Sequence, residues 1–173
     1  VMVCCACGAG PQVNKEPVDP NTRVNQLADG YWAHILAGAP LRASYLGQRS
    51  RDSELPDLSP QARRRFYGGV STFKDQLEAI NADGLDTREH LIFSVLQSRI
   101  RTQLAEKKCR SWSWYVDQLT GPQVALAGLP RFHVVDNEQR GRDLITRYRG
   151  FPRYFAQHRA NLKGGLQTGH VAA

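Results

Sequence analysis

Hydrophobic residues recur at intervals of three and four positions over residues 22–37, which predicts an amphipathic first helix. Its apolar face comprises Val24, Leu27, Ala28, Tyr31, Trp32 and Ile35. Gly38 and Pro40 should stop this helix, because glycine commonly ends a helix and proline cannot continue one. A short helical turn over 41–47 and a polar loop over 48–58 are expected to follow.

A second helix is predicted to begin with Ser59 as its N-cap and Pro60 at its first position. The spacing of three and four continues along one face, through Ala62, Phe66, Val70, Phe73, Leu77 and Ile80. Gly68 and Gly69 interrupt this helix, and each costs about 1 kcal/mol relative to alanine. They therefore predict a close neighbour or a kink at that point. The turn 81–84 should end the helix.

Two further helices have candidate capping boxes, in which a side chain at each of two positions three apart caps the other's backbone. Asp86 and Glu89 would start a third helix with an inward face of Ile92, Leu96, Ile100 and Leu104. Asp136 and Gln139 would start a fourth helix carrying Leu144, Ile145 and Tyr148. The run 150–152, Gly-Phe-Pro, is expected to break it, and a last helix should follow with Phe151, Phe155, His158, Leu162 and Leu166 on one face.

The segment 112–136 is apolar but keeps no helical period. It contains two tryptophans, two prolines and two glycines. This pattern predicts an extended or looped connector. Leaving its large apolar side chains in water would forfeit about 1.5–3 kcal/mol for each, so neighbouring helices should cover it. The predicted fold is all-α, with about five helices and one long apolar connector.

Composition adds that the chain is globular and basic. Its 173 residues are 41% hydrophobic and 23% charged, which suits one soluble domain with a core of its own. The net charge of +7 makes a nucleic acid or an anionic surface one hypothesis. Residues 110–163 hold nine Lys/Arg against four Asp/Glu. Solvated helix faces explain this excess more simply, so nucleic acid is not the expected partner; a binding module using this basic third remains the alternative.

Three cysteines crowd the beginning of the chain, and Cys109 stands alone. This spacing suits neither a disulfide framework nor a two-pair zinc site. A short apolar run before Cys7 instead resembles the end of a bacterial lipoprotein signal. The predicted organisation is then a signal end over 1–7 with the lipid on Cys7, a flexible tether over 8–21, and the amino-terminal part of a larger helical domain over 22–173. Such a protein would be secreted or periplasmic and membrane-anchored; the other explanation is the remnant of an ordinary signal peptide.

Motifs that carry catalytic chemistry are missing. No two of the five histidines are four residues apart, which excludes an HExxH pair of zinc ligands, and no Gly-x-Ser-x-Gly elbow occurs. Cys109 follows two lysines but has no catalytic partner nearby. Trp112, Trp114 and Tyr115 could stack bases, yet aromatic residues beside an apolar run more often belong to a core. The sequence therefore predicts no catalytic residue, metal ligand or cofactor in this chain.

Six short runs in order along the chain carry a family resemblance: 25–32 (NQLADGYW), 40–47 (PLRASYLG), 55–60 (LPDLSP), 117–123 (DQLTGPQ), 149–152 (RGFP) and 164–170 (GGLQTGH). Together they resemble the amino-terminal part of the bacterial domain of unknown function 885 family. The resemblance implies a secreted or lipid-anchored, largely helical protein similar to zinc metallopeptidases, whose HExxH helix lies later in a longer chain. It implies a non-catalytic segment here that contributes to the wall of a substrate cleft. The implied partners are the rest of its own chain and a peptide substrate, with zinc in the full-length parent.

Overall fold

The computed structural model describes residues 18–119 and 121–171. In these residues every regular element is a helix, and five of the helices have seven or more residues. The predicted all-α class is confirmed. Cys7 and residues 8–17 of the predicted tether lie outside the described part of the chain. No helix within the described residues is both long enough and apolar enough to cross a membrane.

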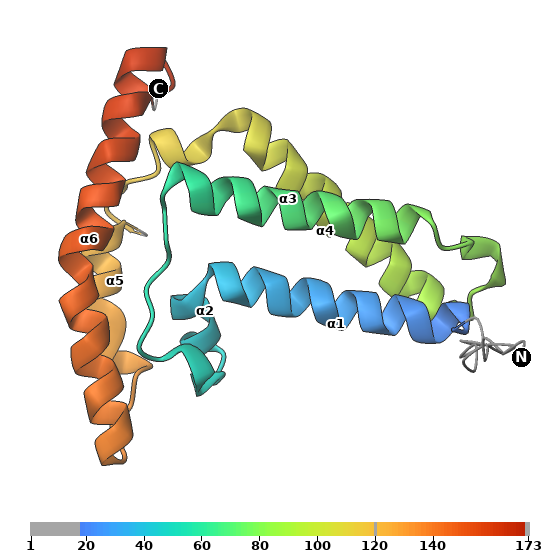
Figure 1. The fold of residues 1–173 in the computed structure, drawn as a ribbon, viewed down its shortest axis with the longest axis horizontal. Helices are drawn as coiled ribbons and strands as arrows, with labels where there is room; N and C mark the ends of the chain where they lie inside the picture. Colours follow the sequence, from blue (N-terminus) through green and yellow to red (C-terminus); the bar gives the residue numbers. More distant parts are fainter. Residues whose placement is uncertain (1–17, 120, 172–173) are drawn as a thin grey trace, which may run out of the picture.

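Three long helices lie side by side and form a bundle: α1 (Pro20–Gly38), α3 (Pro60–Glu78) and α4 (Thr87–Cys109) (Figure 1). The fourth long helix, α6 (Glu138–Thr168), runs across one end of this bundle, with α5 (Pro122–Gly128) beside it (Figure 1). Short elements fill the connections: α2 (Pro40–Tyr45) and the 3₁₀ turns η1 (Arg49–Arg51), η2 (Ala82–Gly84), η3 (Ser111–Ser113) and η4 (Leu129–Arg131).

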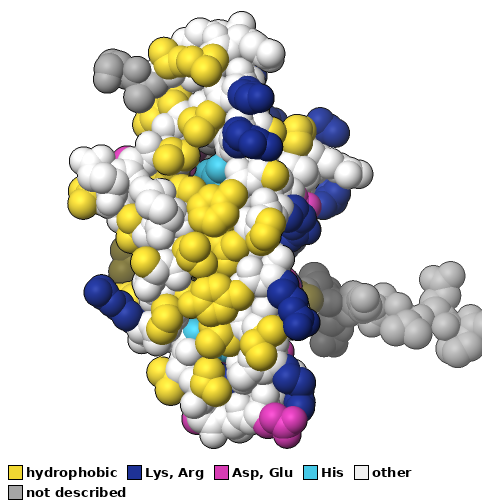
Figure 2. Space-filling model, turned by 90° about the vertical axis from the view of Figure 1, so that its left-hand side faces the viewer, with side chains coloured by type: hydrophobic (Ala, Val, Ile, Leu, Met, Phe, Trp, Pro, Cys, Tyr) yellow, Lys and Arg dark blue, Asp and Glu magenta, His cyan; other side chains and the backbone are white. Residues whose placement is uncertain are grey.

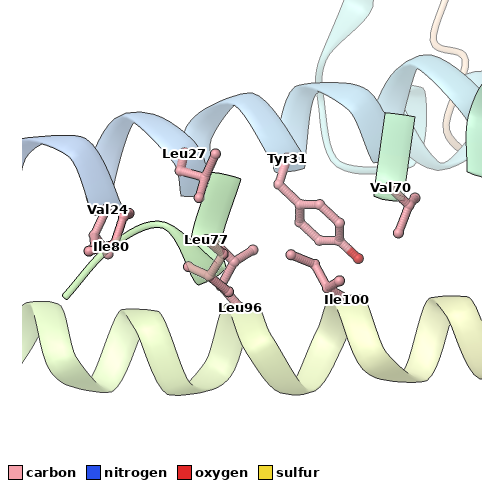
Figure 3. Close-up of a cluster of buried hydrophobic side chains, with 8 residues drawn as sticks. All are labelled: Val24, Leu27, Tyr31, Val70, Leu77, Ile80, Leu96 and Ile100. Atoms are coloured by element: carbon pink, nitrogen blue, oxygen red, sulfur yellow. The ribbon is translucent and has the colours of Figure 1, made fainter. Parts of the chain in front are cut away.

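The bundle has a hydrophobic core to which all three of its helices contribute (Figure 3). Its buried members are Val24, Leu27, Tyr31, Val70, Leu77, Ile80, Leu96 and Ile100. Each of these was expected on an inward face, so the predicted faces of the first three helices are confirmed. Trp32 differs, since it remains 41% exposed. Leu36, which the pattern did not single out, is 2% exposed instead.

A second, smaller core lies under α6. It consists of Leu55, Leu129, Phe151 and Tyr154, which come from the 52–58 loop, η4 and α6. Leu55 belongs to a segment predicted to be a polar loop, yet it is only 7% exposed. The hydrophobic interior is therefore divided between the bundle and the α6 layer.

The capping box predicted at the start of α4 does not form, because residues of α1 bind both of its side chains. Asp86 is the N-cap residue of α4, as predicted, but its carboxylate accepts a hydrogen bond from Asn21 Nδ2 at 3.0 Å and none from the helix backbone. Glu89 is buried and accepts from Asn25 Nδ2 at 3.2 Å. The predicted capping box is therefore wrong, and both acids join α4 to α1. Ser59 caps α3 as predicted, accepting from the Ala62 backbone N–H at 3.2 Å.

The beginnings of α1 and α6 also shift relative to the prediction. Asp19 caps α1 by accepting from the Thr22 backbone N–H, so the helix starts at Pro20, two residues earlier than expected. At α6 the N-cap is Asn137 and not Asp136, because the Asp136 carboxylate pairs with Arg140 at 3.2 Å.

The predicted break at residues 150–152 is wrong, since α6 continues through Pro152 without interruption. Proline removes one backbone hydrogen bond and costs about 3 kcal/mol in a helix interior. Phe151 and Tyr154, on either side of it, are both buried in the second core. Pro152 itself faces solvent, where water can satisfy the carbonyl that its ring leaves unpaired. Packing on the buried face thus outweighs the local cost.

The segment 112–136 is not the plain loop that its pattern predicted, because it contains α5 and η4. Leu129 is completely buried, as a covered connector requires. The prediction that neighbouring helices cover the whole segment is wrong, because several of its large apolar side chains are more than a third exposed. These are Trp114, Tyr115, Val116, Leu119, Val124, Val134 and Val135. Leu129 therefore anchors the segment in the second core, whereas much of the segment's remaining apolar surface is exposed.

Candidate functional site

A cleft of about 800 Å³ lies where the bundle meets α6. The ends of α1 and α4, the first turns of α3, η3 and the later part of α6 line it. Its aromatic lining residues are Phe66, Tyr67, Trp112, Trp114 and Tyr115. Its polar ones are His34, Asp57, Arg63, Arg65, Glu106, Ser111, His158 and Asn161. Segments more than 100 residues apart in sequence therefore converge on one cavity.

Arg63 joins the two sides of this cleft. Its guanidinium carbon lies 4.8 Å from the centroid of the Trp112 ring, a distance that allows a cation–π contact. Its Nη1 donates to the Leu58 carbonyl at 2.7 Å and to Asn161 Oδ1 at 3.0 Å. Burial lowers the pKa of Arg63 from its ordinary value, but a guanidinium remains charged at neutral pH. Arg63 therefore brings a fixed positive charge to an aromatic wall.

His34 is held against α3 from the α1 side. Its Nε2 lies 2.9 Å from the Phe66 carbonyl, to which it donates, and its ring stacks on the Phe66 ring at 5.0 Å between centroids. Gly69 makes room for this ring, because a Cβ at that position would lie 2.4 Å from His34 Cε1. The close neighbour predicted from the glycine pair is thus confirmed at Gly69, whereas Gly68 has no atom within 4 Å of an added Cβ.

His158 provides an uncommitted polar atom in the α6 wall. Its Nε2 is shielded from solvent and has no hydrogen-bond partner among the described residues. The Tyr154 ring lies 4.6 Å away in an edge-on arrangement. Burial lowers the pKa of His158 below its ordinary value, so the imidazole is neutral near pH 7. A neutral imidazole nitrogen can donate or accept a hydrogen bond, depending on the tautomer, but a ligand cannot reach this shielded atom.

Two further ionisable groups of the cleft, Asp57 and Tyr67, have pKa values shifted from their ordinary ones. A hydrogen bond from the Ser59 backbone N–H, assisted by Gln157, lowers the pKa of Asp57, which is therefore an anion at neutral pH. Arg65 lies 3.9 Å from this carboxylate. Burial, followed by the nearby Glu106 carboxylate, raises the pKa of Tyr67, so its hydroxyl stays protonated.

A second polar cluster is buried beneath α6 and centres on Arg147, which is completely inaccessible to solvent. Its guanidinium donates to Ser44 Oγ at 2.9 Å, to the carbonyls of Arg51 and Glu54 at 2.6 and 2.9 Å, and to His133 Nδ1 at 3.3 Å. Asp52, 2% exposed, supplies the counter-charge at 3.8 Å. The cluster therefore ties α2, η1 and the connector to α6.

This buried cluster contains a serine, a histidine and an aspartate, but it is not arranged as a catalytic triad. Ser44 Oγ donates to the Asp52 carboxylate, whereas in a triad the serine donates to the histidine. His133 Nε2 donates to the Arg140 carbonyl at 3.0 Å. All three side chains are also inaccessible to a substrate. The cluster is a structural tie, and the seven-residue spacing of Arg140 and Arg147 was the only sequence signal for it.

The residues considered for chemistry in the sequence are dispersed in the structure. Cys7 lies outside the described residues, and Cys109 is exposed at the end of α4. Trp114 and Tyr115, interpreted as core residues, are 39% and 48% exposed and line the cleft, so that interpretation is wrong for these two. Over residues 18–119 and 121–171, no three His, Cys, Asp or Glu side chains come together in a way that could hold a metal ion. The described residues do not fit a zinc site.

Comparison with known proteins places the chain against a bacterial protein family. The sequence model of a family described as "Bacterial protein of unknown function (DUF885)" matches residues 40–173. Neither a curated protein nor a solved structure matches the chain. The matched range includes most of the cleft and all of the cluster around Arg147.

Proposed function

Since the chain belongs to the bacterial family of unknown function 885, we propose that it supplies one wall of the substrate cleft in a larger, secreted, metallopeptidase-like hydrolase. In this proposal the chain binds peptide substrate and carries no catalytic group of its own. The observation that carries the proposal is the aromatic cleft between the bundle and α6. The peptidase class comes from the family resemblance described above.

The composition of the cleft supports peptide binding. Its volume of about 800 Å³ falls within the range of about 300–1,000 Å³ typical of ligand sites. Such sites are lined mainly by apolar and aromatic side chains, with a few polar groups that orient the ligand. Here the aromatic lining residues are accompanied by the guanidinium of Arg63 and the side-chain amide of Asn161.

An exposed apolar face supports the proposal that the first partner of this segment is the rest of a longer chain. Hydrophobic side chains gather in a band along the side of the molecule where α6 lies, with a row of basic side chains at one edge (Figure 2). Exposed apolar residues of α5 and α6 include Val124, Ile145 and Leu166. Large contiguous apolar patches on soluble proteins commonly mark interaction sites. In the proposal, the remainder of the parent covers this band.

The alternative function, a binding module that uses the basic third of the chain, has weaker support. Arg140 and Arg147, two of the basic residues of α6, are 7% and 0% exposed and engage Asp52. They are not available to an anionic partner. A nucleic-acid affinity that falls steeply with rising salt concentration would favour this alternative.

The proposed function predicts different behaviour for this chain and for its full-length parent. The purified chain should bind an apolar peptide, detected as a change in tryptophan fluorescence, and should hydrolyse none. The parent should contain stoichiometric zinc by elemental analysis and should hydrolyse the same peptide. Hydrolysis by the purified chain, or a parent that neither binds zinc nor cleaves peptides, would refute the assignment.

Membrane attachment through Cys7 is the second part of the proposal. A single acyl chain gives only marginal membrane binding, so stable anchoring takes additional chains, as bacterial lipoproteins carry on one cysteine. Replacing Cys7 with serine in the full-length precursor should move the protein from the membrane fraction to the soluble fraction. Cys109→Ser is the matched control and should leave the protein in the membrane fraction. A Cys7→Ser protein that still pellets with membranes would rule out this anchor.

A further inference from the structure

Arg63 keeps one edge of its guanidinium group free at the cleft. A guanidinium has five N–H donors, and the two on Nη1 are used by the Leu58 carbonyl and Asn161 Oδ1. Within the described chain, Nε and Nη2 donate no hydrogen bond, and neither is sealed from solvent. The free edge is therefore the Nε–Nη2 side, whose two parallel N–H groups match the two oxygens of a carboxylate.

The charge of Arg63 is also not neutralised inside the cleft. Among the residues that the structure describes, no carboxylate lies within ion-pair distance of its guanidinium. The two acids of this cleft have other partners. Asp57 accepts from the Ser59 backbone N–H and Gln157 Nε2 and lies beside Arg65, and Glu106 accepts from Gln103 Nε2 at 2.6 Å. A partly buried cation without a counter-charge has lost hydration that a bound anion would replace. The site therefore favours an anionic ligand group.

An apolar surface continues from this cation along the connector. Arg63 lies over the Trp112 ring, and the next aromatic residues in the chain, Trp114 and Tyr115, line the same cleft with 39% and 48% of their surface exposed. On the α6 wall, His158 lines the cleft, but its Nε2 is shielded from solvent and is not within reach of a ligand. A planar anion and an apolar side chain are thus accommodated in one cavity.

We infer that this cleft binds the free carboxyl-terminal residue of a peptide, with its carboxylate on the Nε–Nη2 edge of Arg63 and its apolar side chain against Trp114 and Tyr115. The inference rests on the proposed function, since it names the part of the peptide that the substrate wall recognises. An internal stretch of peptide has no carboxylate in its backbone and would leave the charge of Arg63 unpaired. The cleft therefore distinguishes chain ends from chain interiors.

The test compares three small probes on the whole purified chain: N-acetyl-phenylalanine, its carboxamide, and phenyl phosphate. Isothermal titration calorimetry should show the acid binding about tenfold or more tightly than the carboxamide, because a bidentate charge-assisted pair replaces a neutral contact. The acid should also bind more tightly than phenyl phosphate. Arg63→Gln should abolish the preference for the acid. Arg64→Gln is the matched control, since Arg64 is the neighbouring exposed arginine and does not line the cleft.

Each outcome of this test bears on the inference. Equal affinity for the acid and the carboxamide in the unaltered chain would overturn it while leaving peptide binding by the cleft intact. Tighter binding of phenyl phosphate would overturn the carboxylate assignment. Failure of every probe, and of a longer apolar peptide, would count against the proposed function as well. The comparison of probes needs no variant, so an Arg63→Gln protein that fails to fold, as judged by circular dichroism, does not remove the test.

Discussion

Replacing Arg147 with alanine is expected to lower the free energy of unfolding by about 3–5 kcal/mol. The substitution removes the donors to Ser44 Oγ, to the carbonyls of Arg51 and Glu54, and to His133 Nδ1. It also takes away the guanidinium that lies 3.8 Å from the buried Asp52 carboxylate. Several acceptors would then be buried without a partner, and each such loss is costly in itself. Urea denaturation followed by circular dichroism would measure the change.

Arg149→Ala is the matched control, because Arg149 lies two residues away on the same helix and is exposed. Its removal should change stability by no more than about 0.5 kcal/mol. Combining Arg147→Met with Asp52→Asn should recover part of the loss, since the buried carboxylate loses its charge together with the guanidinium, while Arg140 keeps Asp136 as a counter-charge. A loss below about 1 kcal/mol for Arg147→Ala would contradict the view that this cluster holds α6 to the rest of the domain.

Replacing Gly165 with alanine is expected to destabilise the protein by about 3 kcal/mol, at the upper end of the usual cost of overpacking. A Cβ on Gly165 would lie 2.3 Å from the Ser113 carbonyl oxygen, which is a backbone atom and cannot swing aside. The helix α6 would have to move away from η3. Because η3 carries Trp112, this movement would also widen the cleft and weaken peptide binding.

The neighbouring glycine gives a control of opposite sign. Gly164 has no atom within 4 Å of an added Cβ, so Gly164→Ala should raise stability by about 0.5 kcal/mol through helix propensity alone. Thermal unfolding of both variants, together with their fluorescence response to an apolar peptide, would test the pair. Equal effects of the two substitutions would show that the close approach of α6 to η3 is not a constraint.

The fold was predictable where a local pattern and the tertiary packing favour the same structure. The faces of α1, α3 and α4 follow from their periodicity, and the Ser59 cap from the Ser-Pro pair. Prediction failed where residues distant in the sequence determine the local structure. Nothing near Asp86 in the sequence indicates that Asn21 will take its carboxylate, and nothing near Pro152 reveals the core that carries α6 through it.

The cleft was predictable to a smaller extent than the fold. Trp112, Trp114 and Tyr115 were conspicuous in the sequence, but burial was the more probable fate for aromatic residues in an apolar run. Arg63 was one of three consecutive arginines with no local feature to distinguish it. Its role depends on Trp112 and Asn161, which lie 49 and 98 residues further along the chain. Such convergence exists only in three dimensions.

The division of the interior into two cores has a consequence for motion. The bundle core and the α6 core have no buried member in common, and the cleft lies along the seam between them. The bond from Arg63 Nη1 of α3 to Asn161 Oδ1 of α6 is among the polar contacts that cross this seam. Hinge opening would break contacts of this kind while both cores stay dry, at a free-energy cost well below that of global unfolding. A ligand that touches both walls would then shift the ensemble toward the closed conformers.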